Sequence, residues 1–127
     1  MTPAIDALFK RVPAPLTEAS TDPEILALVQ VAVDSVPNHP TAQAGLWLYV
    51  GDWERAHDIC QIDEVATAGW HAVIHRREGD FSNALYWHRR ARTDDSLTRK
   101  LAAGDVTNLE IEQQQEWRDL WALVGPG

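Results

Sequence analysis

A Gly-Asp pair occurs three times between residues 51 and 105, each time between two stretches with the apolar spacing of a helix. The three strings are GDWERA at 51–56, GDFSNA at 79–84 and GDVTNL at 104–109. Glycine readily adopts the left-handed conformation that ends a helix. Aspartate can then accept hydrogen bonds from the first amides of the next helix. The pattern therefore predicts helices joined by tight turns into hairpins that stack and share a core.

The remaining sequence has the same helical character. Apolar spacing predicts helices at 3–11, 25–36, 41–50, 53–62, 64–78, 81–92, 96–103 and 108–124. Side chains expected to cap them are Thr21 or Asp22, Thr41, and the capping box Thr107–Glu110. No stretch alternates convincingly with the period of a strand. We therefore expect an all-α fold, a compact bundle of helical hairpins with about six to eight helices.

A length of 127 residues fits one domain. Within residues 1–127 we expect N-terminal helices over 1–40 and two helical hairpins over 41–92. A third hairpin and the C-terminal helix are expected over 93–127. The six tryptophans are expected to pack in the core and between helices, with Trp117 and Trp121 buried against the hairpins or across a dimer interface.

The net charge of −8 is unevenly distributed. Residues 71–100 carry seven Lys or Arg against four Asp or Glu, whereas acidic residues dominate on both sides. An acidic protein is poorly suited to general nucleic-acid binding, which depends on neutralising phosphates. The basic segment could instead attract a small anion or the acidic part of a second subunit.

The sequence also favours a cytoplasmic location. The N-terminus lacks a signal pattern, and no apolar run approaches the roughly 20 residues of a membrane span, so no membrane partner is expected. The single cysteine, Cys60, cannot form an internal disulfide, which suits a reducing compartment. We expect Cys60 to be a buried apolar residue rather than a reactive thiol.

The segment Gly69–Arg92 is the richest in chemistry. It holds three of the five histidines, five of the eleven Lys or Arg and two of the six tryptophans. On a helix, His71 and His75 lie one turn apart and Glu78 continues the same face, with Glu64 and Thr67 preceding them. Two imidazoles and a carboxylate could bind Zn²⁺ or Fe²⁺ with open coordination positions. The alternative is a polar face whose histidines bond to carboxylates or backbone.

A second possible site is an anion cluster. Arginines flank the turn at 79–80, at positions 76, 77, 89 and 90, and Tyr86 and Trp87 lie between them. Paired guanidinium groups beside aromatic rings could hold a phosphate or carboxylate on a planar ligand. The alternative is internal ion pairing, between Arg76 and Asp80 and between Arg90 and Asp94. His57 and Asp58 are adjacent on a helix and do not face each other, so both are expected at the surface.

The string GWHAVIHRREGDFSNALYWHRRA resembles the tetratricopeptide pattern. The resemblance rests on Ala72, His75, Gly79, Asp80, Phe81, Ala84 and Ala91, and covers roughly residues 42–92, more weakly 96–112. It implies paired antiparallel helices. The segment is also similar to the signature of an uncharacterised, mainly bacterial family, through Trp70, His71, His75, Arg76, Arg77, Glu78, Asp80, Asn83, Tyr86, Trp87 and Arg90. That resemblance implies no activity.

Two functions remain open at this point. The leading expectation is a helical-repeat module that binds a protein partner or self-associates, as a homodimer. The alternative is a small-anion or metal-binding protein, possibly an enzyme, with its site on the hairpin at 64–92. No residue is assigned a catalytic role. The candidate ligand-binding residues are His71, His75, Arg76, Arg77, Tyr86, Trp87 and Arg90, and the candidate metal ligands are His71, His75 and Glu78.

Overall fold

Eight α-helices and no strands make up residues 1–126, the part of the chain that the computed structural model describes. The helices are α1 (Pro3–Arg11), α2 (Pro23–Asp34), α3 (Pro40–Tyr49), α4 (Trp53–Ile62), α5 (Ala68–Arg77), α6 (Phe81–Ala91), α7 (Ser96–Ala102) and α8 (Leu109–Val124). The expected all-α fold is confirmed. Gly127, which the sequence places after the last helix, lies outside the described residues.

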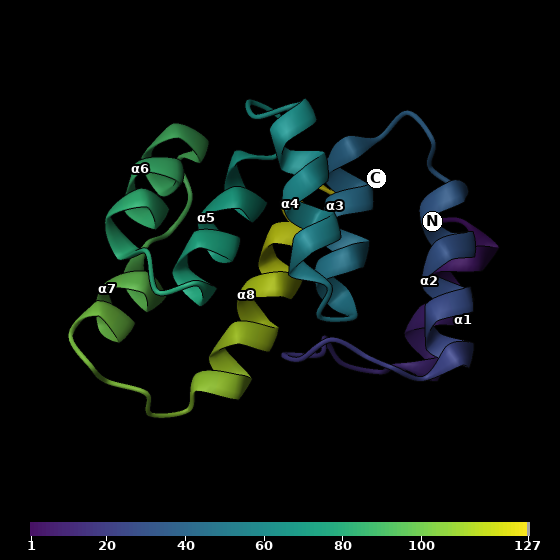
Figure 1. Ribbon diagram of the computed structural model, residues 1–127, viewed down its shortest axis with the longest axis horizontal. Helices are drawn as coiled ribbons and strands as arrows, with labels where there is room; N and C mark the ends of the chain where they lie inside the picture. Colours follow the sequence, from purple (N-terminus) through teal and green to yellow (C-terminus); the bar gives the residue numbers. More distant parts are fainter. Residues whose placement is uncertain (127) are drawn as a thin grey trace.

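The helices follow one another in a row from α1 to α7 (Figure 1). Successive helices pack together, and the closest pairs are α3 with α4 and α5 with α6. The last helix, α8, leaves this order and returns to pack on α3 in the middle of the row. Within the row, α4 also packs against α5, although the two helices belong to different hairpins.

The three Gly-Asp turns adopt the expected backbone. Gly51, Gly79 and Gly104 have φ angles of 80°, 82° and 84°. Asp52 caps α4 by accepting a hydrogen bond from the amide of Arg55. Asp80 caps α6 by accepting one from the amide of Asn83. Asp105 differs, because its carboxylate accepts from the amide of Thr107 before α8 begins.

Two expected caps are wrong. Thr41 lies inside α3, and the cap is His39, whose Nδ1 accepts a hydrogen bond from the amide of Ala42 at 3.1 Å. The capping box at 107–110 is absent, since α8 begins after Asn108, which has a φ of 56° and makes no side-chain cap bond. The expected cap Asp22 is confirmed and accepts from the amide of Glu24.

The helix expected over 64–78 begins four residues later, at Ala68. Asp63 ends α4 with a non-helical backbone, its carboxylate accepts from the amide of Ala66, and residues 64–67 form a turn before α5. Glu64 lies in this turn and is exposed. The polar stripe on the helix is therefore shorter than expected and begins at His71.

Tryptophans attach both α8 and α5 to α3, in the middle of the row. The indole of Trp117 donates to the carbonyl of Gly45 at 2.8 Å, and Trp70 donates to the carbonyl of Thr41 at 2.9 Å. Gly45 allows this approach, because a Cβ there would lie 2.7 Å from the Trp70 ring. Trp121 stacks on Trp117 with ring centroids 5.2 Å apart. The two C-terminal tryptophans thus pack within the molecule, against the hairpins.

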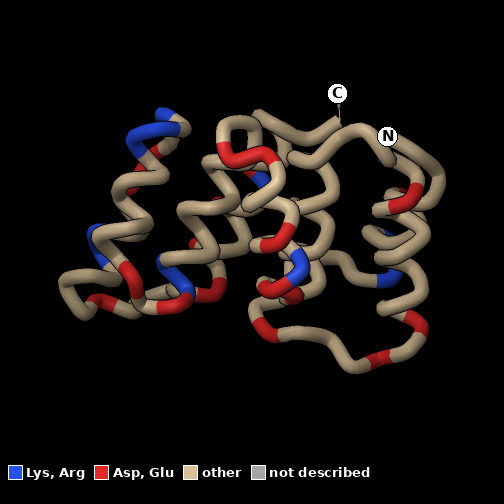
Figure 2. Tube along the Cα trace, turned by 45° about the horizontal axis from the view of Figure 1, so that its top comes forward, with Lys and Arg blue, Asp and Glu red and all other residues tan. Residues whose placement is uncertain are grey.

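The charges differ between the ends of the molecule. Figure 2 shows basic residues gathered at the end formed by α6 and α7, whereas acidic residues are spread along the chain. Among the described residues, no helix has both the length and the apolar character required to cross a membrane.

Candidate metal centre

Three histidines converge where α4 packs against α5. His71 and His75 lie one turn apart on α5, with ring centroids 4.8 Å apart. His57 on α4 brings its ring within 5.1 Å of His71 and 5.6 Å of His75. Ring nitrogens of the three residues lie within 4.8 Å of one another. The structure therefore adds His57 to the pair identified from the sequence.

Helix α6 holds His71 in place from the other side. Ala68 and Ala72 on α5 form a small apolar cluster with Trp87 on α6. The small alanine side chains allow the indole to reach His71, and the two rings stack with centroids 4.1 Å apart and planes 18° apart. This stack covers one face of the imidazole. The ring of His75 is nearly parallel to that of His71, at 21°, and the ring of His57 approaches it at 73°.

His71 is buried without a hydrogen bond to its Nδ1. The residue is only 4% exposed, and Nδ1 has no partner among the described residues. Burial, and to a smaller extent the neighbouring His75 and His57, lowers the pKa of His71 to about 4. The ring is therefore neutral at physiological pH, which is the form that binds a metal ion.

Acidic side chains lie beside His75. Its Nδ1 is 3.6 Å from a carboxylate oxygen of Glu78 and 3.9 Å from one of Asp80, and it makes no hydrogen bond within the described chain. Glu78 is exposed at the end of α5. The three side chains whose ligand atoms lie close together are the imidazoles of His57, His71 and His75. Glu78 is thus placed to attract a cation to His75, and His57 takes the third position of the cluster.

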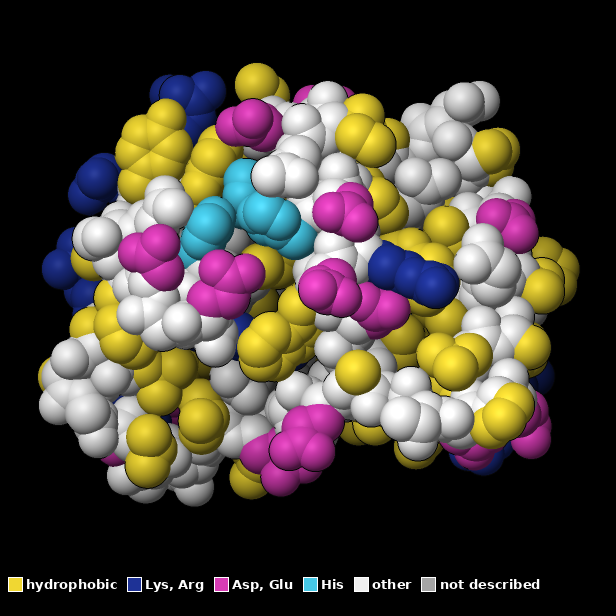
Figure 3. Space-filling model, in the orientation of Figure 1, with side chains coloured by type: hydrophobic (Ala, Val, Ile, Leu, Met, Phe, Trp, Pro, Cys, Tyr) yellow, Lys and Arg dark blue, Asp and Glu magenta, His cyan; other side chains and the backbone are white. Residues whose placement is uncertain are grey.

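The geometry suits a metal ion after a small adjustment. Nitrogens that share one tetrahedral Zn²⁺ at about 2.0–2.1 Å lie roughly 3.4 Å apart. The separations here reach 4.8 Å, so rotation of the half-buried His57 and His75 side chains would close the site. Figure 3 shows the histidines together on one face of the molecule, with acidic side chains beside them. This open side leaves room for a fourth ligand.

The arginines expected to form an anion cluster do not gather. Arg76 is buried and makes two hydrogen bonds of 2.7 Å with the carboxylate of Glu116 on α8, rather than an ion pair with Asp80. Arg77 lies over the ring of Trp53, 5.2 Å from its centroid. The two neighbouring guanidinium groups therefore contact different helices, because adjacent residues point in different directions.

The other half of the expected cluster is exposed. Arg90 lies 5.7 Å from the ring centroid of Tyr86 and 5.9 Å from that of Trp87, and it donates to the hydroxyl of Tyr86. Among the proposed ligand-binding residues, the structure thus brings His71 and His75 to one side of Trp87, while Tyr86 and Arg90 also contact the Trp87 ring.

Cys60 lies near the cluster in sequence but is chemically separate from it. The residue is fully buried, and burial raises the pKa of its thiol to about 11. A thiol that remains protonated is a poor ligand and a poor nucleophile. The expected structural role of Cys60 agrees with this environment.

Comparisons of the chain with protein-family models, with curated proteins and with solved structures found no match.

Proposed function

We propose that this protein binds a divalent transition metal ion, with Zn²⁺ the best fit, through His57, His71 and His75. The observation that carries the proposal is the convergence of three imidazoles from two separate hairpins on one point. Burial of His71 with an unpartnered nitrogen supports it, since an isolated buried polar atom is costly unless something binds it.

The ligand set favours particular metals. Imidazole nitrogen suits Zn²⁺, Cu²⁺, Fe²⁺ and Ni²⁺, whereas Mg²⁺ and Ca²⁺ require oxygen ligands. Three neutral histidines leave the positive charge of the ion uncompensated, and Glu78 and Asp80 beside His75 offset part of it. Three protein ligands with an open fourth position are typical of zinc sites that exchange water or a substrate.

A bound ion would also join α4 to α5. His57 belongs to the first hairpin, and His71 and His75 belong to the second. A ligand that binds only the folded state stabilises it by about 2.7 kcal/mol at 100 times its dissociation constant. We therefore expect metal to raise the unfolding temperature.

Protein purified without a histidine tag tests the proposal. It should bind one equivalent of Zn²⁺ after dialysis, and Co²⁺ should give the visible absorption bands of a four-coordinate site. The variant His39→Asn is the control and should bind Zn²⁺ as the wild type does. His39 lies outside the cluster, and asparagine can also cap a helix. Substoichiometric metal and an octahedral Co²⁺ spectrum would count against the site.

A second proposal is that the chain self-associates. Ile62 and Val65, at the end of α4 and in the following turn, are 83% and 76% exposed. These two apolar side chains, three positions apart in the sequence, would be covered by contact with a second copy of the chain. Light scattering coupled to size exclusion should give twice 14.2 kDa for the wild type and 14.2 kDa for the double variant Ile62→Ser, Val65→Ser. A wild-type monomer would contradict this proposal and leave the metal site untouched.

A further inference from the structure

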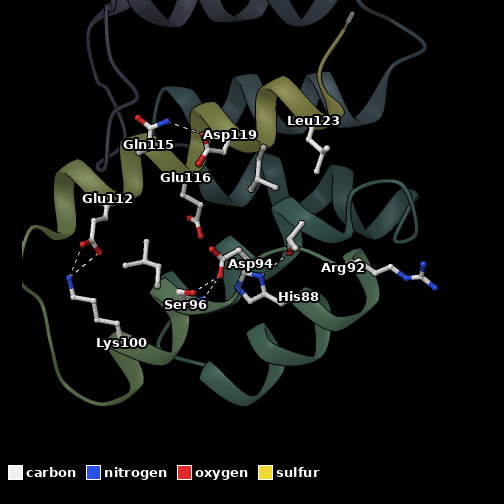
Figure 4. A pocket seen from close by; sticks show the side chains of 13 residues that line it. His88, Arg92, Asp94, Ser96, Lys100, Glu112, Gln115, Glu116, Asp119 and Leu123 are labelled. Atoms are coloured by element: carbon white, nitrogen blue, oxygen red, sulfur yellow. Dashed lines mark hydrogen bonds and ion pairs between the residues drawn. The ribbon is translucent and has the colours of Figure 1, made fainter.

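A hollow of about 560 Å³ lies between the end of α6, α7 and α8. It forms because α7 packs on α6 while α8 packs on α3, so that α7 and α8 do not close on each other. Figure 4 shows side chains from α8 facing those of α6 and α7 across this space, which we call the α6–α8 pocket. Its volume lies within the range of about 300–1,000 Å³ that is usual for small-molecule sites.

The floor of the pocket is rigid and electrically balanced. The carboxylate of Glu116 is paired with the buried guanidinium of Arg76. His88 is held at both ring nitrogens, by Thr93 at 3.0 Å and Thr98 at 2.7 Å. Burial lowers the pKa of His88, which keeps the ring neutral. Apart from Nε of Arg76, which has no partner in the described chain, these groups satisfy one another and shape the pocket without demanding a charged ligand.

The walls carry two carboxylates that no cation neutralises. Asp94 accepts hydrogen bonds from the amide and hydroxyl of Ser96, which lower its pKa and keep it ionised. Asp119 accepts one from the side-chain amide of Gln115 at 2.9 Å. Within the described chain neither forms an ion pair with a Lys, Arg or His.

Cations near the pocket are engaged elsewhere or point away. Lys100 lies at the rim and contacts both carboxylate oxygens of Glu112 at 3.0 Å. Arg92 extends out of the pocket in Figure 4. The pocket therefore has a net negative charge although it is located at the basic end of the molecule.

Leucines supply the apolar part of the lining. Leu97 comes from α7, and Leu120 and Leu123 come from α8. Leu123 is 69% exposed and stands at the mouth of the pocket. A ligand with an apolar body would cover this side chain and remove it from water.

We propose that the α6–α8 pocket binds a small organic ammonium ion, a protonated primary amine attached to an apolar body. The ammonium group donates to Asp119, Asp94 adds negative charge to the same lining, and the body lies on the three leucines. Carboxylates without a neighbouring cation exclude phosphates and carboxylic acids from the same space. This site shares no residue with the histidine cluster and does not depend on metal.

Calorimetric titration with 2-phenylethylammonium tests the assignment. The amine should bind saturably with one site per chain, whereas 2-phenylethanol and phenylacetate, which have the same ring without the positive charge, should not bind. Amide resonances of residues that line the pocket, such as Ser96, Leu97 and Leu120, should shift in ¹H–¹⁵N spectra during the titration. Equal binding of the alcohol, or shifts confined to other residues, would overturn the proposal, as would the absence of saturable binding at millimolar amine.

A matched pair of variants isolates the charge. Asp119→Asn should weaken amine binding at least about tenfold, because it removes the negative charge that accepts from the ammonium group. Asp34→Asn is the control, since Asp34 on α2 makes the same bond to a glutamine four residues earlier and is remote from the pocket. Equal affinities of the two variants would contradict a role for Asp119, and their ¹H–¹⁵N spectra report whether each remains folded.

Discussion

The imidazole of His71 lies flat against the indole of Trp87, with ring centroids 4.1 Å apart. The stack joins α5 to α6 and fixes the orientation of the most buried histidine in the cluster. The ring of His57 from α4 approaches the imidazole at 73°. A histidine in this position is both a packing residue and a candidate ligand, and the two roles predict different responses to pH and to metal.

We expect the metal-free protein to lose stability as the pH falls from about 6.5 to about 4. Burial lowers the pKa of His71 to about 4, whereas the unfolded chain takes up this proton near the ordinary value of 6.5. In this interval the unfolded state binds more protons, so acid favours unfolding, by up to about 3 kcal/mol for this group. Urea unfolding at a series of pH values measures the effect.

The variant His71→Gln identifies the source of this pH dependence. Its free energy of unfolding should change less between pH 6.5 and 4 than that of the wild type. Some dependence should remain, because burial also lowers the pKa of His88. Identical slopes for the variant and the wild type would show that His71 is not protected from protonation.

The buried ion pair between Arg76 and Glu116 should be the polar contact most sensitive to substitution. Glu116→Gln leaves the guanidinium buried beside a neutral group, and loss of one partner of such a pair costs about 3–5 kcal/mol. Glu112→Gln, on the same helix, removes a more exposed pair with Lys100 and should cost less than about 1 kcal/mol. Chemical unfolding of both variants checks the contrast, which similar losses would refute.

Two glycines with nearly equal backbone angles should respond differently to alanine. At Gly79 a Cβ meets no atom within 4 Å. Gly79→Ala should therefore lower the free energy of unfolding only by the cost of holding alanine in a left-handed backbone, about 1–2 kcal/mol. At Gly51 a Cβ would lie 2.3 Å from backbone atoms of Glu18, and overpacking adds about 1–3 kcal/mol. The unfolding temperature of Gly51→Ala should therefore be well below that of Gly79→Ala. The reverse order would contradict the packing of Glu18 on this turn.

Much of the fold could be predicted because its signals are local. The Gly-Asp pairs place the turns, and apolar spacing places the helices between them. The errors arose at helix starts, where one polar side chain decides the first residue of the helix. The segment at 64–67 reads as helix, but it forms a turn in which the carboxylate of Asp63 accepts from the amide of Ala66, and the helix begins at Ala68.

The candidate site could be predicted only in part, because sequence spacing does not specify how separate helices pack. His71 and His75 share one helix, so their proximity follows from spacing alone. His57 joins them only through the packing of α4 on α5, which no local pattern specifies. It is half-buried in the cluster rather than at the surface, whereas Asp58 is exposed as expected. Arg76 was likewise paired with a neighbour in sequence, whereas its partner Glu116 lies 40 residues away.

Competitive titration of Zn²⁺ against a chromogenic chelator tests the central claim most directly. Loss of outer-shell partners alone costs about 10–100-fold in metal affinity, so His57→Gln, which removes a ligand, should weaken binding by at least about 100-fold. His39→Asn should bind as the wild type does. Equal affinities of the wild type and His57→Gln would contradict a metal centre built from His57, His71 and His75.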